Sequence, residues 1–320
     1  MRSFTSILGW LVCIAVVGNA SHALAQRAKT VGSVIVVTTA TKLRTQTNDN
    51  ARIIAATKRG MLLKVLIEKG DYRRVVRITR EGVDRAIFGW IHVKHVCAFE
   101  DSVAFYTRAV NESPKDPELL RIRAILQMTQ REFAKALADL NAALRLNPKF
   151  AEAYHDRGNI WLMQGENDKA IADQSQAIAL NPKNSRYYAA RGIGRGRSGQ
   201  FDRAVADLNA AIKNNPKRAR LYVIRGDSQF SLGKLEKAIE DYSAAAERNP
   251  RSYLAFQRRG AVWLKKNALA QSISDFTKSI KLYPMAVAYE GRGIAWGKKG
   301  NLKLALVDLN RAIQLEPNSA

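Results

Sequence analysis

The sequence has few of the residues that cross-link small exported domains or bind metal ions. It contains two cysteines, Cys13 and Cys97, and four histidines among 320 residues. If Cys13 is lost with a leader peptide, the remaining cysteine has no internal disulfide partner, so the fold must depend on side-chain packing. His92 and His95 stand three residues apart in a segment with a strand pattern. They would point to opposite faces, which argues against a metal site there.

Acidic residues are also scarce relative to basic ones. The chain has 52 Lys and Arg against 28 Asp and Glu, a formal net charge of +24. The excess is spread out, since residues 26–98 hold 15 basic and 5 acidic side chains and residues 99–320 hold 36 and 23. A field of this sign favours acidic partners such as anionic lipid headgroups, acidic proteins or nucleic acid, without choosing among them.

A long apolar run occurs at residues 7–18, where the sequence reads ILGWLVCIAVVG. It follows Arg2 and precedes Ala23 and Ala25, the small residues that a signal peptidase reads. This pattern predicts a signal peptide over residues 1–25 and an exported protein, periplasmic or secreted in a bacterium. The alternative is an uncleaved membrane anchor, which needs an apolar stretch nearer ~20 residues.

The prolines are placed at a fixed interval. Six of them stand 34 residues apart and a seventh follows after 33. Proline cannot continue a helix because it lacks the N–H and clashes with the preceding turn. The spacing therefore predicts units of constant length that each end in a helix stop. The prolines in this register are Pro114, Pro148, Pro182, Pro216, Pro250, Pro284 and Pro317.

Between the prolines, an aromatic residue recurs at position 4 of the unit, glycine at position 8, and alanine or serine at positions 20 and 27. This pattern resembles the tetratricopeptide repeat family, which implies an all-α solenoid of antiparallel helix pairs. The predicted solenoid spans residues 101–320. It comprises a half repeat at 101–116 and repeats at 117–150, 151–184, 185–218, 219–252, 253–285 and 286–319.

Two positions of the unit carry opposite charges throughout. Position 7, where the family usually has leucine, is always arginine, and position 23 is always aspartate. We expect structural ion pairs within or between neighbouring units, because a partly buried arginine without a partner is costly. The arginines are Arg123, Arg157, Arg191, Arg225, Arg259 and Arg292, and the aspartates are Asp139, Asp173, Asp207, Asp241, Asp275 and Asp308.

The amino-terminal region has short β-rich runs separated by turn residues, which predicts a small β barrel over residues 31–98. The barrel resembles the bacterial Src-homology-3-like domain of exported proteins, through TKLRTQ (41–46), KRGMLLKVL (58–66), GDYRRV (70–75) and GWIHVKHV (89–96). That resemblance implies a module that binds peptide or cell-wall ligands, although a barrel can equally serve as a spacer. The fold class is therefore α+β, a barrel followed by a solenoid.

No site for catalysis stands out. Residues 194–199 read GRGRSG, which spells a phosphate-binding pattern, but they fall within a predicted helix without a preceding strand. Interior glycines each cost a helix about 1 kcal/mol, so we expect unit 185–218 to be the least stable. With Cys97 the only cysteine after the leader, and with no nucleophile paired to a base, the sequence predicts no enzyme, no cofactor and no metal.

The tetratricopeptide resemblance implies a concave groove lined by positions 2, 5, 9, 12 and 13 of each first helix. A carboxylate clamp is not expected, because Ala190 stands where the partner of His155 and Asn159 would be. The predicted groove residues are His155, Asn159, Met163, Arg186, Arg197, Asp227, Phe230, Gln257, Lys265, Glu290 and Lys298.

These patterns favour an exported adaptor that binds a protein or peptide, with an acidic partner or a cell-envelope component expected and nucleic acid not expected. The alternative is an electrostatic binder of anionic polymer or of the envelope surface. Leu304 and Val307 lie three residues apart on one face of the final helix, where earlier units mostly have a basic and a small residue. They predict a contact with another chain, such as a second copy in a homo-oligomer.

Overall fold

The structure is a computed structural model that describes residues 101–316 in full. In the amino-terminal region it describes the backbone of seven strands and the side chain of Val75. The predicted signal peptide, residues 1–25, lies outside the described residues. The strands are β1 Val34–Val37, β2 Lys42–Arg44, β3 Ile53–Ala56, β4 Leu62–Lys69, β5 Tyr72–Thr79, β6 Gly82–His92 and β7 Val96–Ala98.

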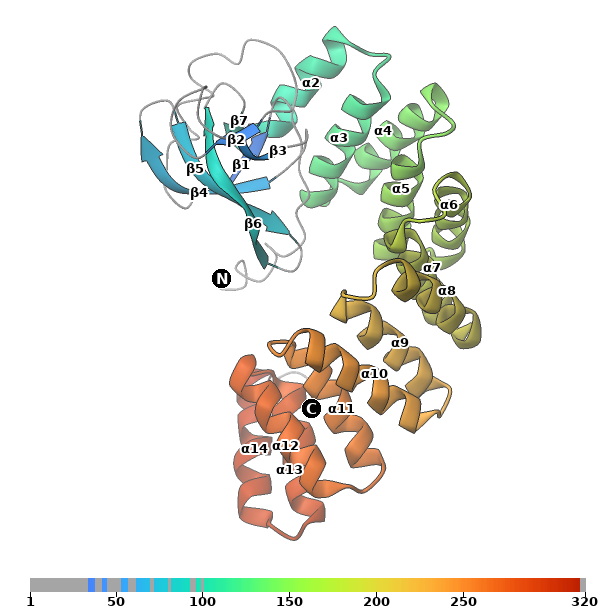
Figure 1. The fold of residues 1–320 in the computed structure, drawn as a ribbon. Helices are drawn as coiled ribbons and strands as arrows, with labels where there is room; N and C mark the ends of the chain where they lie inside the picture. The colour runs from blue at the N-terminus through green and yellow to red at the C-terminus, as the bar shows by residue number, and fades with distance from the viewer. Residues whose placement is uncertain are drawn as a thin grey trace. The chain divides into compact units, whose positions relative to one another are not determined.

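The strands form one sheet in the order β3-β2-β6-β5-β4-β1-β7, and the pairs between them are antiparallel (Figure 1). β4 and β5 pair up to Lys69 and Tyr72, as in a tight hairpin. Val75 of β5 is fully buried. Closure of this sheet into a Src-homology-3-like barrel stays a prediction.

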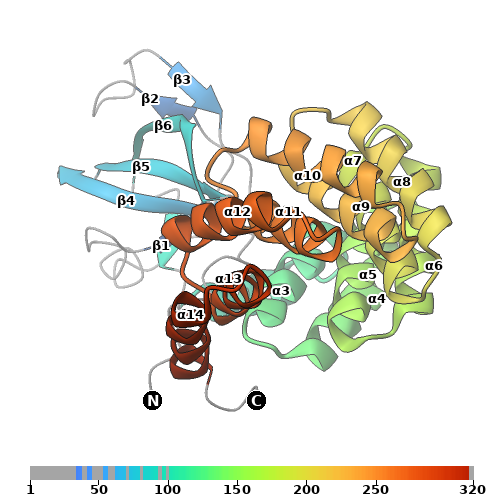
Figure 2. The same ribbon diagram turned by 90° about the horizontal axis from the view of Figure 1, so that it is seen from below.

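Thirteen helices follow within residues 101–316. After the single helix α2 they alternate between an odd-numbered first helix and an even-numbered second helix of each unit. The two helices of a unit pack against each other in the pairs α3 with α4, α7 with α8, α9 with α10, α11 with α12 and α13 with α14 (Figures 1 and 2). The helices are α2 Ser102–Glu112, α3 Pro117–Thr129, α4 Phe133–Leu146, α5 Ala151–Gln164, α6 Asn167–Leu180, α7 Ser185–Arg197, α8 Phe201–Asn214, α9 Ala219–Ser231, α10 Leu235–Arg248, α11 Tyr253–Lys265, α12 Leu269–Leu282, α13 Ala286–Lys298 and α14 Leu302–Leu315.

An Asn-Pro pair stops the second helices α4, α6, α8 and α10. α10, for example, ends at Arg248, one residue before Asn249 and Pro250. The residue before a proline is pushed out of the helical region, and Asn249 has φ −138° and ψ 88°. Its side-chain Oδ1 accepts a hydrogen bond from the backbone N–H of Arg251 at 3.1 Å. The proline register therefore sets the length of each unit.

The turn inside each unit needs a residue with positive φ at position 15. Gly199 and Gly233 have φ of 74° and 73° there, and glycine adopts this conformation without strain. Arg131 and Asn267 hold the same position at 62° and 60°. The last glycine of the sequence GRGRSG is thus the turn residue of its unit.

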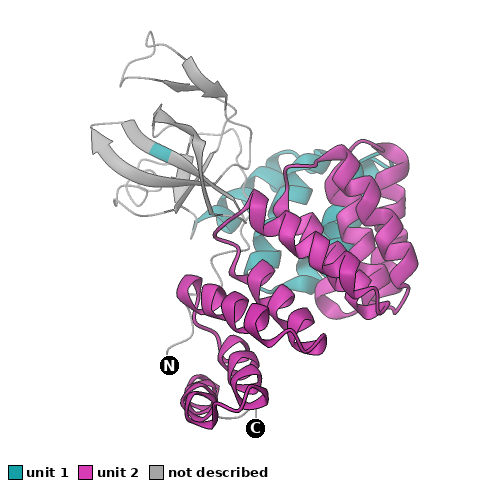
Figure 3. Ribbon diagram, turned by 60° about the horizontal axis from the view of Figure 1, so that its bottom comes forward, with its two compact units in different colours: residues 1–160 teal, residues 161–320 magenta. Residues whose placement is uncertain are grey.

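The chain divides into two compact units, residues 1–160 and residues 161–320, which are described separately (Figure 3). In the first, Tyr106 and Leu126 are fully buried, and in the second Tyr187 and Tyr242 are. A methyl group at Gly226 would lie 2.7 Å from Cε1 of Tyr242. The glycine at position 8 therefore lets the first helix approach the large side chain of the second.

Candidate functional site

The first helices of residues 161–320 lie side by side. α7 contacts α9, α9 contacts α11, and α11 contacts α13. The repeat accounts for this, because each first helix begins 34 or 33 residues after the previous one and packs against the same part of its neighbour. We call the exposed side of α7, α9, α11 and α13 the first-helix surface.

The predicted site residues on this surface fall into exposed and buried groups. Arg186, Arg197 and Lys265 are exposed, and so are Glu290 and Lys298. The exposed charge is therefore mostly basic. Arg197 is also tied down, because its Nη1 donates to the backbone carbonyl of Leu162.

Met163 is 46% exposed just before the turn that follows α5, and Asn159 is half-buried one turn earlier. Asn159 Nδ2 lies 3.1 Å from Nε2 of His155, within the same helix. In residues 161–320, Asp227 and Phe230 are half-buried on α9.

Position 5 does not face a ligand as expected. His155 is 9% exposed and Gln257 7%, and their counterparts Ala189 and Val223 are buried as well. In residues 161–320 the cause is the neighbouring first helix, which covers this position. Only Glu290, on the last first helix of the described chain, is exposed there. His155 and Gln257 are thus corrected from surface residues to buried ones.

The centre of the surface is a patch of four residues on α9 and α11, which we call the central patch: Asp227, Phe230, Arg258 and Lys265. Arg258 Nε lies 3.2 Å from Asp227 Oδ1, and the Lys265 ammonium lies 4.9 Å from the centre of the Phe230 ring. Tyr242 Oη donates to Asp227 at 2.8 Å. Burial raises the pKa of Asp227, while Arg258 and the Tyr242 hydrogen bond act against that rise.

Sequence reasoning missed Arg258, because position 6 is not among the positions assigned to the groove. A signal was available, since Asp227 and Arg258 carry opposite charges on consecutive first helices. The central patch presents an aromatic ring beneath an ammonium group, beside a guanidinium that is 46% exposed in its side chain. Such a group of side chains can contact an apolar residue and pair with a carboxylate.

Five arginines at position 7 bond to the aspartates at position 23 of their own unit. Arg191 Nε and Nη2 donate to the two oxygens of Asp207 at 2.9 and 2.7 Å. Asp207 is 3% exposed. Equivalent two-point pairs join Arg123 to Asp139, Arg225 to Asp241, Arg259 to Asp275 and Arg292 to Asp308.

Each of these arginines from unit 185–218 on also reaches the preceding unit. Arg191 Nη1 donates to Ser175 Oγ at 3.1 Å, and Arg225 Nη1 donates to Asn209 Oδ1 at 2.7 Å. Arg259 and Arg292 bond in the same way to Ser243 and Thr277. In residues 1–160, Arg157 Nη1 donates to Asn141 Oδ1 at 2.7 Å. Because these N–H groups are used inside the array, we assign the arginines a structural role.

The part of the chain that the structure describes shows no cluster of three or more His, Cys, Asp or Glu side chains that could hold a metal ion. Among the described residues, no helix combines the length and the apolar character needed to span a membrane. The GRGRSG segment runs from the buried Gly194 of α7 to the turn at Gly199. It has no strand before it and no free helix N-terminus, so it is not a phosphate site.

Part of the chain matches a known repeat family. Residues 123–185 and 190–253 match a family model described as tetratricopeptide repeat. No curated protein matches the chain.

Several solved structures share the fold. One is the crystal structure of the APC/C hetero-tetramer Cut9-Hcn1, with 16% identity and a TM-score of 0.60 over 69% of this chain and 44% of that chain. The chain thus spans less than half the length of that relative. PilW, a type IV pilus biogenesis factor, gives 19% identity and a TM-score of 0.59 over 63% and 94%. A tetratricopeptide repeat protein from Parabacteroides merdae gives 19% and 0.57 over 69% and 88%. Identities this low indicate a shared fold and do not indicate a shared function.

Proposed function

We propose that this chain, whose helical part is an array of tetratricopeptide repeats, is an exported, non-catalytic adaptor that binds an acidic protein or peptide on its first-helix surface. The observation that carries the proposal is the central patch. Phe230 lies beneath the exposed Lys265, and Arg258 keeps part of its side chain open to solvent while it pairs with Asp227. A bound segment can place an apolar side chain on the ring and carboxylates on the basic groups.

The surrounding charge supports an acidic partner. Arg186, Arg197 and Lys298 are exposed on the same surface, and Glu290 is its exposed acid. Complementary charge of this kind speeds association and discriminates against basic competitors.

In this proposal the amino-terminal sheet is a Src-homology-3-like barrel that acts as a second ligand-binding module or as a spacer. The leader over residues 1–25 would take the chain out of the cytoplasm into a periplasm or the medium. Both statements rest on the sequence motifs.

A second candidate function is an electrostatic binder of anionic polymer or of the cell envelope. The formal net charge of +24 favours it. The two candidates differ in their salt dependence. Binding that depends on neutralising a polyanion falls log-linearly with salt, whereas binding at a shaped aromatic and charged patch falls much less.

The test uses the chain from residue 26 onward as bait for a displayed library of acidic peptides, and the best peptide is then titrated at several salt concentrations. We expect Phe230→Ala to weaken binding by about tenfold, as loss of a buried aromatic contact does. Lys265→Gln should weaken binding several-fold.

The matched control is Lys213→Gln, which removes the same charge from an exposed position on α8 and should leave the affinity unchanged. Equal losses for Lys265→Gln and Lys213→Gln, with no effect of Phe230→Ala, would reject the adaptor and favour the electrostatic binder.

A further inference from the structure

The last helix that the structure describes, α14, exposes an apolar stripe. Leu302, Leu306 and Ile313 of α14 are 68%, 62% and 53% exposed. Their spacing places them on one face of the helix. Large exposed apolar groups that share a face mark an interaction surface rather than ordinary solvent-facing positions.

The earlier units show what covers this stripe. On α8 the same three positions are Phe201, Val205 and Ile212, and all are half-buried. The first helix of the next unit, α9, packs against α8. In the same way, α11 packs against α10 and α13 against α12. The stripe on α14 therefore repeats a surface that elsewhere in residues 161–320 holds a first helix.

The polar part of this surface is repeated as well. Asn209 of α8 accepts a hydrogen bond from Arg225 Nη1 of the covering helix at 2.7 Å. The residue at that position on α14 is Asn310, which is exposed. Thus α14 has the two features by which α8 binds a first helix. One is the apolar stripe, and the other is an amide that can accept a hydrogen bond from the arginine of the covering helix.

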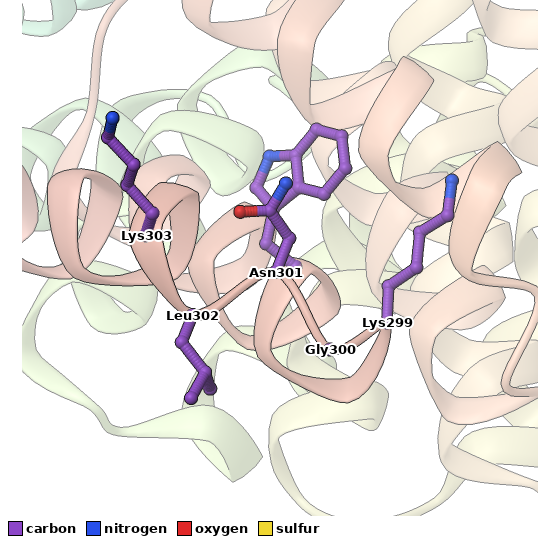
Figure 4. A pocket seen from close by; sticks show the side chains of 6 residues that line it. Lys299, Gly300, Asn301, Leu302 and Lys303 are labelled. Atoms are coloured by element: carbon purple, nitrogen blue, oxygen red, sulfur yellow. The ribbon is translucent and has the colours of Figure 1, made fainter.

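An open surface pocket adjoins the start of the stripe. It has a volume of about 520 Å³ and is lined by Trp296 of α13 and by residues 299–303, with Lys299 and Lys303 on either side of the turn (Figure 4). On α8 and α10 the residue equivalent to Lys303 is acidic, and a lysine from the covering unit pairs with it. Lys234 Nζ lies 3.1 Å from Asp202 Oδ1, and Lys266 pairs with Glu236. An acidic group at the place of these lysines would let an occupant of α14 pair with Lys303.

We propose that α14 is a docking surface for one amphipathic helix of another protein, bound as α9 is bound on α8. The helix would carry a small or apolar residue over Leu306, since Val262 of α11 packs in one hydrophobic cluster with Ile239, the counterpart of Leu306 on α10. It would carry an arginine that donates to Asn310 and an acidic residue beyond its C-terminal end, facing Lys303. This surface goes beyond the ligand surface proposed above and does not depend on it.

The charge and the chain's own packing favour a foreign helix over a second copy. Within residues 161–320, α9, α11 and α13 already cover α8, α10 and α12. The lysines that follow α9 and α11, Lys234 and Lys266, would also be repelled by Lys303. The stripe is distinct from the predicted oligomer contact, since the counterparts of Leu304 and Val307 on α8, Arg203 and Ala206, stay exposed in the array.

The probe is a synthetic peptide of residues 219–235 of this chain, labelled and held helical by a lactam bridge on the face away from Arg225. Three versions are titrated with the chain from residue 26 onward by fluorescence anisotropy: the natural peptide, the peptide with Lys234→Glu, and that peptide with Arg225→Ala in addition. We expect Lys234→Glu to tighten binding by about three- to tenfold, as exchange of an exposed repulsion for an attraction does. Arg225→Ala should weaken binding by about fivefold through the lost hydrogen bond.

Variants of the protein assign the surface. Leu306→Ala should weaken binding of the Lys234→Glu peptide by about tenfold, while Leu304→Ala, the matched control on the same helix, should leave it unchanged. With Asn310→Ala, the two Lys234→Glu peptides should bind equally, because the partner of Arg225 is gone.

The proposal is overturned if no saturable binding occurs up to about 1 mM peptide, or if Leu306→Ala and Leu304→Ala behave alike. It is also overturned if light scattering shows a homo-oligomer that Leu306→Ala converts to monomer, because a second copy would then occupy the surface.

Discussion

The pair between Arg191 and Asp207 allows a quantitative prediction for Asp207→Ala. The Asp207 side chain is 4% exposed and accepts from Arg191 at two points and from Arg195 Nη1 at 2.9 Å. Removal of one partner from a buried ion pair costs about 3–5 kcal/mol, because the other charge is left unpaired. Arg191 remains 17% exposed in its side chain and keeps its bond to Ser175, so we expect a loss at the lower end, about 3 kcal/mol.

The assay is urea unfolding followed by far-ultraviolet circular dichroism, combined with amide hydrogen exchange. Stability in a repeat array is local, so the exchange rates of α7 and α8 should rise more than those of α12. Asp202→Ala is the control. Its side chain is 76% exposed and pairs with Lys234, so its loss should stay below about 1 kcal/mol. If Asp207→Ala destabilises the chain no more than Asp202→Ala, the arginines are not held by the aspartates in the way described.

Three further substitutions test the local physics. Gly196→Ala should raise the free energy of unfolding by about 1 kcal/mol in urea titrations, since a methyl group there would lie 3.9 Å from Ser228 Oγ; no gain would show that α7 resists a side chain at this point. Arg131→Gly should raise the melting temperature, since glycine relieves about 1 kcal/mol at a φ of 62°; a lower melting temperature would mean that the Arg131 side chain stabilises the turn. Because burial raises the pKa of Asp227, its stabilising contribution is present below the ordinary pKa of an aspartate and is lost as the pH rises through the folded-state pKa. Asp227→Asn should therefore flatten the dependence of the unfolding free energy on pH just above the ordinary pKa of an aspartate, and an unchanged slope would assign that dependence to other groups.

The unit length and the two-helix pattern could be read from the sequence because proline has one conformational effect wherever it stands. The match to the tetratricopeptide repeat model agrees with that reading. The contact between Arg191 and Asp207 follows from two charges at fixed positions of one unit. The further bond from Arg191 to Ser175 could not be predicted, because position 25 of the unit changes between asparagine, serine and threonine along the array.

The candidate site was less accessible to sequence reasoning. Position 5 is buried at Gln257 because the adjacent first helices meet there, and that depends on how each helix is rotated about its axis. Arg258 entered the central patch for the same reason, since rotation brings position 6 next to Asp227. The stripe on α14 was partly visible in the sequence, but only the packing of α9 on α8 shows that Leu306, rather than Leu304, has the counterpart that a neighbour covers.

The arginine bonds between units have a direction. Arg225 reaches back to Asn209, and Arg259 reaches back to Ser243. A ribosome releases the earlier unit first, so each newly made arginine finds its acceptor already in place. The order of synthesis and the direction of these contacts therefore agree, and each unit can fold onto the one made before it.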